Sequence, residues 1–264
     1  DLELILHPMA EDAKEATGSM GDDTPLAVLS DKYRPLYHFF RQNFSQVTNP
    51  PIDSLRENKV MSLKTRFGNL GNILNFDNLT KDNIYVLDSP ILSNSQLKKF
   101  INYFGKNSYE IDCTFEKSEN LEIALERIQK EAEIEVRKGV KQLILSDKNI
   151  SEKRLPIPML LSVGAINSYL INNKLRGYVS INVQTGEALD THSFATLLGV
   201  GATTVNPYLA LDCLYQRFEK KLFGNFEYED CIKRYIKSVN SGLLKIMSKI
   251  GISVLSSYRG GCNF

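Results

Sequence analysis

The stretch from Gln142 to Val183 decides the fold class. It opens with the apolar run Gln142-Leu143-Ile144-Leu145, continues through a helical pattern over Pro158–Asn172, and closes with Tyr178-Val179-Ser180-Ile181-Asn182-Val183. Nearly continuous apolar runs are typical of strands that are buried on both faces of a sheet. A strand, a helix and a further strand in this order form a right-handed crossover between parallel strands. This stretch therefore predicts an α/β fold with a mostly parallel sheet.

The alternation of strands and helices extends on both sides of this stretch. Upstream, the pattern predicts strands at Ile84–Leu87 and Tyr109–Phe115 and helices over 93–104 and 121–136, the first of which opens with the capping box Ser93-x-x-Gln96. Downstream, it predicts a helix around His192–Leu198, a strand at Ala202–Val205, helices over roughly 208–223 and 229–249, and a candidate sixth strand at Ile252–Leu255. Gly242 leaves open whether the last helix is one piece or two, and the pattern does not decide between an open sheet and a degenerate barrel.

Residues 1–80 have a different character, because they are rich in Pro, Gly and Asn and carry few strand-like runs. Pro25 follows capping residues and predicts a helix start. A second helix is predicted near Pro35, with an apolar face made by Leu36, Phe39, Phe40 and Phe44. We therefore predict an irregular loop/helix N-terminal segment over 1–80 and an α/β domain over 81–264, together forming one structural unit.

The composition argues against several classes of partner. The net charge is +1, from 32 basic and 31 acidic residues, so there is no electrostatic reason to expect nucleic acid or a membrane surface as a partner. No apolar run is long enough to span a bilayer. The four cysteines form no Cys-x-x-Cys pair, which argues against a zinc or redox motif and favours a reduced, cytoplasmic protein.

Polar residues follow the predicted strands, where ligands bind in parallel α/β folds. They are Asp88, Glu116, Asp147, Glu187 and Asn206. One interpretation is the site of a stand-alone small-molecule enzyme that uses carboxylates for acid–base work or metal binding. The other is that these side chains cap or flank helices, which is the routine content of βα loops and which we favour.

The histidines and the glycine-rich motifs add no complete catalytic set. His7, His38 and His192 lie in no metal-ligand spacing, and only His192 is near a predicted strand end. Gly199-Val200-Gly201 could approach a phosphate, but it follows a helix and precedes a strand, which favours a glycine-capped loop. Arg259-Gly260-Gly261 is either an anion-binding nest or a flexible end of the chain. Since the sequence begins at Asp1 rather than Met, we expect an excised piece of a larger protein.

Long strings in the chain resemble the central domain of the glutamate synthase large chain. They include Glu15–Ser30, Gln46–Asp53, Thr185–Ala188, Asn206–Ala210 and Leu244–Lys249, and the resemblance runs over nearly the whole sequence. The chain departs from the family pattern at Ile166-Asn167-Ser168 and Leu189–Ser193, where the family tends to carry histidines and an arginine. These departures favour a scaffold over a catalytic domain.

The resemblance implies a role in a larger reaction. In the family, glutamine is hydrolysed at an N-terminal cysteine, and ammonia passes through a tunnel to an FMN domain, where 2-oxoglutarate becomes glutamate. The implied partners are therefore the glutaminase and FMN domains of the same chain, with a small reductase subunit or ferredoxin for the full enzyme. FMN and the iron–sulfur cluster belong to other parts of that enzyme, so the resemblance implies no cofactor, no metal and no catalytic residue in this piece.

The resemblance also suggests which residues of this chain meet the ammonia tunnel and the neighbouring domains. We expect Met20, Gly21, Asp22, Asp23, Thr48 and Asn49 to form this tunnel and interdomain surface. Small or mildly polar side chains suit a passage for neutral ammonia, and glycine-containing loops fit closely against another domain. The alternative is that these residues only pack.

Overall fold

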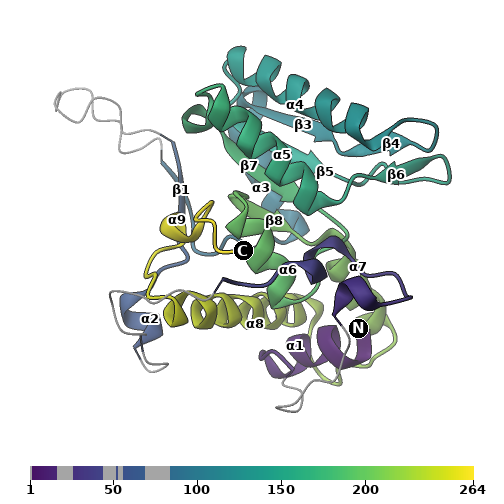
Figure 1. Cartoon of the computed structure of the whole chain (residues 1–264). Coiled ribbons are helices and arrows are strands. Elements are labelled where there is room, and N and C mark those ends of the chain that lie inside the picture. The colour runs from purple at the N-terminus through teal and green to yellow at the C-terminus, as the bar shows by residue number, and fades with distance from the viewer. Residues whose placement is uncertain (1, 17–25, 44–51, 53–55, 69–83) are drawn as a thin grey trace.

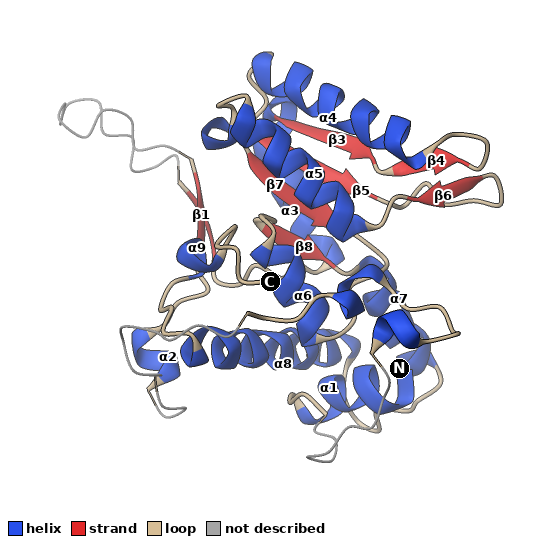
Figure 2. Cartoon of the chain, in the orientation of Figure 1, coloured by secondary structure: helices blue, strands red, loops and turns tan. Residues whose placement is uncertain are grey.

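The chain folds around a four-stranded parallel sheet (Figures 1 and 2). The computed structural model describes residues 2–16, 26–43, 52, 56–68 and 84–264. The strands are β3 (Ser108–Asp112), β5 (Gln142–Ser146), β7 (Ser180–Gln184) and β8 (Thr204–Asn206), and they lie side by side in that order. All five residues of β5 are buried, which explains the uninterrupted apolar run that predicted this strand. The predicted α/β class with a mostly parallel sheet is confirmed.

Three crossover helices connect the strands of this sheet. They are α4 (Leu121–Arg137), α5 (Met159–Asn172) and α6 (Thr191–Gly199). Asn120 caps α4, because its side chain accepts a hydrogen bond from the Glu122 amide at 2.8 Å. Within the described part of the chain the sheet ends at β3, so it is open at that edge. At the opposite edge, Ile91 forms a parallel bridge with Val205 of β8.

The predicted strand at Ile84–Leu87 exists as β2 (Tyr85–Leu87), but it does not join the parallel sheet. It pairs antiparallel with β1 (Thr65–Phe67). These two strands form a separate small core with α3 (Asn94–Phe104), in which the Phe67 and Phe100 ring centroids lie 4.9 Å apart. The predicted capping box of α3 is confirmed by reciprocal hydrogen bonds between Ser93 and Gln96.

The predicted strand Tyr109–Phe115 is two strands. β3 ends at Asp112, whose side chain accepts hydrogen bonds from the Thr114 amide and hydroxyl at 2.9 and 2.7 Å. β4 (Thr114–Glu116) then leaves the sheet and pairs antiparallel with β6 (Arg154–Pro156). Arg154 fixes this junction, because its guanidinium pairs with Asp112 at 3.1 Å.

The chain after β8 is helical, with α7 (Tyr208–Glu219) followed by α8 (Tyr228–Lys249). α8 is one continuous helix, so Gly242 does not divide it. The candidate sixth strand at Ile252–Leu255 is wrong. Val254 forms a single bridge with Ser62, and Leu255 already begins the short helix α9 (Leu255–Tyr258).

The N-terminal residues pack on the same body. The π-helical turn η1 (Leu2–Leu6) and the helix α1 (His7–Asp12) bury Leu6 and Met9 in the main core, and α1 packs against α8. α2 (Glu57–Val60) is a single helical turn. The helix predicted near Pro35 is only a 3-10 turn, η3 (Leu36–Phe39), because Phe40 has extended backbone. A similar turn, η2 (Ala27–Leu29), lies where Pro25 predicted a helix. No helix of the described residues has the length and apolarity needed to cross a bilayer.

Candidate functional site

The carboxylate of Asp147, at the end of β5, is directed at the neighbouring loop. The Asp147 side chain is fully buried and accepts a 2.5 Å hydrogen bond from the Thr185 hydroxyl and a 3.1 Å bond from the Gly186 amide. The Tyr208 hydroxyl is a further donor. Burial raises the pKa of Asp147, and these hydrogen bonds oppose that rise. The side chain therefore ties the end of β5 to the loop after β7.

Glu187, after β7, caps a helix. Its carboxylate accepts a 3.0 Å hydrogen bond from the amide of Met159, the first residue of α5. Burial raises the pKa of Glu187 to about 7, and the nearby charge of Asp147 adds to the rise. α5 has no side-chain cap from its own preceding residue, Pro158, so Glu187 supplies one from a distant part of the sequence.

The other strand-end residues do not converge on one site. Asn206 donates to the Leu92 carbonyl at 2.9 Å and so holds the segment beside β8. Asp88 is exposed and pairs with Lys64 at 3.6 Å. Glu116 is exposed in β4, away from the main sheet. The structure thus brings Asp147 and Glu187 near each other and gives both of them structural partners, as the capping interpretation expected.

The histidines also have structural contacts. His192 at the start of α6 bonds through Nε2 to the Tyr37 carbonyl at 2.9 Å. His7 stacks on Phe223 with ring centroids 4.6 Å apart. Its Nδ1 accepts a 3.1 Å hydrogen bond from Arg217. Neither contact leaves an imidazole arranged for catalysis.

A different feature stands out on the surface, between residues 26 and 39. Five large apolar side chains are exposed there, which we call the apolar ledge. They are Leu26 (60% exposed), Val28 (72%), Leu29 (72%), Tyr33 (86%) and Phe39 (49%). Leu26, Val28 and Phe39 also line one small hollow of about 160 Å³ together with His38 and Arg41. Large exposed apolar patches are typical of interaction surfaces on soluble domains.

The segment that carries the ledge is held firmly to the body of the domain. Leu36, Tyr37 and Phe40 are partly buried and pack against the main core, and η3 contacts α5 and α6. At the end of this segment, the Asn43 amide donates to the Asn263 carbonyl at 2.7 Å. Its side chain also donates to the Cys262 carbonyl at 3.2 Å. The ledge therefore projects from an anchored segment.

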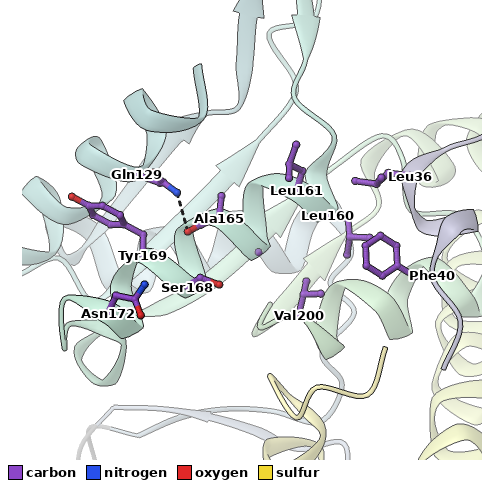
Figure 3. A pocket seen from close by; sticks show the side chains of 11 residues that line it. Leu36, Phe40, Gln129, Leu160, Leu161, Ala165, Ser168, Tyr169, Asn172 and Val200 are labelled. Atoms are coloured by element: carbon purple, nitrogen blue, oxygen red, sulfur yellow. Dashed lines mark hydrogen bonds between the residues drawn. The ribbon is translucent and has the colours of Figure 1, made fainter. Parts of the chain in front are cut away.

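Next to this segment, a groove of about 470 Å³ runs along the outer face of α5 (Figure 3). Leu36 and Phe40 lie at one end, beside Leu160 and Val200, and Tyr169 and Asn172 lie at the other. Along α5 its floor is made of the small residues Gly164, Ala165 and Ser168. Small residues on a helix allow another segment to approach its backbone closely. The groove and the ledge share the segment over residues 36–40.

The model of the glutamate synthase central domain family matches residues 1–264. The chain belongs to this family. The chain is 56% identical over 267 residues to the glutamate synthase [NADPH] large chain of Azospirillum brasilense. This alignment covers 100% of the chain and 18% of the relative. It is 41% identical to glutamate synthase [NADH] of Schizosaccharomyces pombe, in an alignment that covers 98% of the chain and 13% of that relative. It is also 41% identical to the chloroplastic ferredoxin-dependent glutamate synthase of Spinacia oleracea, covering 98% and 17%.

The central domain thus spans less than a fifth of the length of these relatives. Among solved structures, a flavocytochrome b2 double mutant with pyruvate bound aligns with a TM-score of 0.43 and 13% identity, covering 64% of this chain and 38% of that chain. A likeness this weak supports no conclusion about ligand or function.

The family resemblance implies two cofactors of the larger enzyme, FMN and an iron–sulfur cluster. At the strand ends, the carboxyl groups of Asp147 and Glu187 accept hydrogen bonds from backbone amides of the domain, so they offer no donors to an FMN phosphate. Among the described residues, no group of three His, Cys, Asp or Glu side chains is placed to hold a metal ion. Cys113 and Cys231 are buried, whereas Cys262 is exposed, so these three thiols do not share one setting for a cluster.

The tunnel and interdomain residues expected from the resemblance, Met20, Gly21, Asp22, Asp23, Thr48 and Asn49, lie outside the described residues. The described ledge lies between them in sequence, from Leu26 to Phe39. Sequence reasoning did not identify the ledge, because of its five residues only Phe39 entered a prediction, on the apolar face of the helix expected near Pro35. The signal that was present is a run of large apolar residues with neither helical nor strand periodicity.

Proposed function

We propose that this domain is the connecting domain of a glutamate synthase large chain. In this proposal it holds the glutaminase and FMN domains in place, lines part of the ammonia path between them, and carries out no chemistry itself. The apolar ledge is the observation that carries the proposal, since five exposed large apolar side chains on an anchored segment need a partner to cover them.

The partner we infer is another domain of the same polypeptide. The relatives are more than five times as long as this chain, so most of the large chain is available to cover the ledge and the neighbouring groove. Contacts between domains of one chain bury surfaces of this partly apolar kind. Met20 and the pair Thr48-Asn49 flank the ledge in sequence, which supports placing them at the same interface.

The names of the relatives support a role that is independent of the electron donor. Relatives named for NADPH, for NADH and for ferredoxin all carry a closely similar central domain. We therefore infer that the domain serves the steps that these enzymes share, and that a reductase subunit or ferredoxin is bound elsewhere. The four free cysteines agree with a reducing compartment such as the cytoplasm.

The stand-alone enzyme hypothesis has less support. It needs free carboxylates at the strand ends, but Asp147 and Glu187 are bonded to backbone amides of the domain itself. A general acid or base must instead reach a substrate. The proposal therefore assigns the hydrolysis of glutamine and the formation of glutamate to the other domains.

The test is the ratio of glutamine consumed to glutamate formed by a full-length large chain that contains this domain. Thr48→Leu should block glutamine-dependent synthesis and spare synthesis from added ammonia, because a bulky side chain closes the path. Thr48→Ala should fold normally but weaken the coupling between the two reactions, so that more glutamine is consumed for each glutamate formed. The control is Ser151→Leu, which places the same bulk on an exposed loop and should change neither activity. Wild-type ratio and rate in both Thr48 variants would show that these residues only pack.

A further inference from the structure

Two arginine side chains approach the same loop, at the end of the sheet opposite to Asp147 and Glu187. Arg176 lies just before β7, in the turn η7 (Arg176–Tyr178). Its guanidinium donates to the Asn167 side chain at 2.7 Å, to the Val179 carbonyl at 2.6 Å and to the Gly201 carbonyl at 2.9 Å. All three acceptors are neutral, so Arg176 brings an uncompensated positive charge to the loop between α6 and β8.

Arg259 follows α9 and reaches the same region. Its Nε is enclosed by the protein and has no hydrogen-bond partner. The residues around it pack on the same loop: a Cβ added at Gly199 would lie 2.6 Å from the Phe264 ring and 3.8 Å from the Tyr258 ring. The buried Tyr258 hydroxyl also lacks a partner. The two motifs that the sequence left open, at Gly199–Gly201 and Arg259–Gly261, therefore lie side by side.

Among the residues that the structure describes, no acidic side chain balances the charges of Arg176 and Arg259. Burial lowers the pKa of Arg259 to about 10, and the positive charge of Arg176 lowers it further. Burial also lowers the pKa of Arg176. Within the described part of the chain, neither guanidinium forms an ion pair with an Asp or Glu. Arg176 and Arg259 are both partly buried, and two neighbouring cations withdrawn from water are costly unless an anion joins them.

We propose that Arg176 and Arg259 form a binding site for a carboxylate, supplied by an Asp or Glu from a part of the large chain outside these 264 residues. The planar guanidinium fork matches a carboxylate in two parallel hydrogen bonds. Arg176 uses three of its donors within the domain, which leaves N–H groups for an anion, and Arg259 has its Nε free. The source of the carboxylate rests on the proposed function, whereas the site itself does not.

The test is amide hydrogen exchange of residues 255–261 in the full-length large chain, in chloride buffer without carboxylates. Arg259→Met removes the charge and keeps an apolar stem of similar length. If a carboxylate of the large chain is bound, this change removes one of its two guanidinium partners and leaves its charge only partly compensated, and exchange should be at least about tenfold faster. Arg259→Lys, which keeps the charge and loses the fork, should shift exchange in the same direction by less. Arg137→Met is the control, because its ion pair with Glu133 is exposed on α4.

A second arm adds acetate. One outcome is that Arg259→Met has no effect without acetate, and that acetate slows exchange in the wild type but not in Arg259→Met. The two arginines then do bind a carboxylate, but the carboxylate comes from solution, and the proposed source in the large chain is wrong. If Arg259→Met leaves exchange unchanged or slower in both buffers, there is no bound carboxylate and the proposal is overturned. None of these outcomes depends on the Thr48 variants, so a failure here is separate from a failure of the proposed function.

Discussion

Replacing Gly242 with alanine should destabilise the domain, against the usual trend. In an exposed helix interior, Gly→Ala stabilises by about 1 kcal/mol. Gly242 is instead buried in α8 where that helix crosses the start of α6. An added Cβ would lie 2.5 Å from Cγ2 and 2.6 Å from Oγ1 of Thr191, closer than van der Waals contact allows. Overpacking of this kind costs about 1–3 kcal/mol, and we expect a net loss of about 1–2 kcal/mol.

Urea unfolding followed by far-UV circular dichroism measures this change, since the chain has no tryptophan. Thr191→Ala provides the matched background. Its hydroxyl has no partner, so its removal should cost little. In that background Gly242→Ala should be close to neutral, because the two nearest atoms are gone and the Thr191 Cβ is 3.1 Å away. If Gly242→Ala stabilises the unmodified chain by about 1 kcal/mol, the close packing of α8 on α6 is refuted.

Three further predictions concern other parts of the domain. The pKa of Glu187 is raised from 4.5 to about 7, so the free energy of unfolding should fall by up to about 3 kcal/mol as pH rises between these values. Urea titrations at pH 5 and 8 measure this fall, and Glu187→Gln should abolish it. Gly201→Ala should lower the melting temperature strongly, because Gly201 has φ +126° and the new Cβ would lie 2.6 Å from the Asn167 side chain; an unchanged melting temperature contradicts this. The isolated chain should not quench FMN fluorescence saturably, and saturable quenching would show that the strand ends do accept a phosphate.

The parallel sheet could be predicted because its strands are buried on both faces. Gln142–Ser146 and Ser180–Gln184 bury nearly every residue, so their apolar character is continuous in the sequence. The start of α3 was equally predictable, since a capping box depends only on residues three apart. The sequence did not predict how two short segments pair. Val254 and the strand over 85–87 have apolar residues in strand-like runs, but their pairing depends on which distant segment lies beside them.

Less of the candidate site could be predicted. Leu36, Phe39 and Phe40 have helix-like spacing, yet the fold leaves Phe39 exposed while Leu36 packs against the core. The approach of Arg176 to Arg259 depends on how α9 packs on the loop at Gly199, which no local pattern in the sequence encodes. The sequence did indicate the family, because long strings of loop residues are more specific than the periodicity of helices.

Hydrogen exchange of residues 26–39, compared between this chain alone and the full-length large chain, tests the central claim most directly. The apolar ledge should exchange at least about tenfold more slowly in the large chain, because a neighbouring domain covers it and suppresses local opening. The exposed face of α4, which includes Ile123, provides the internal control and should exchange equally in both. Equal exchange of residues 26–39 in the two proteins would contradict the claim that this surface connects the domain to the rest of glutamate synthase.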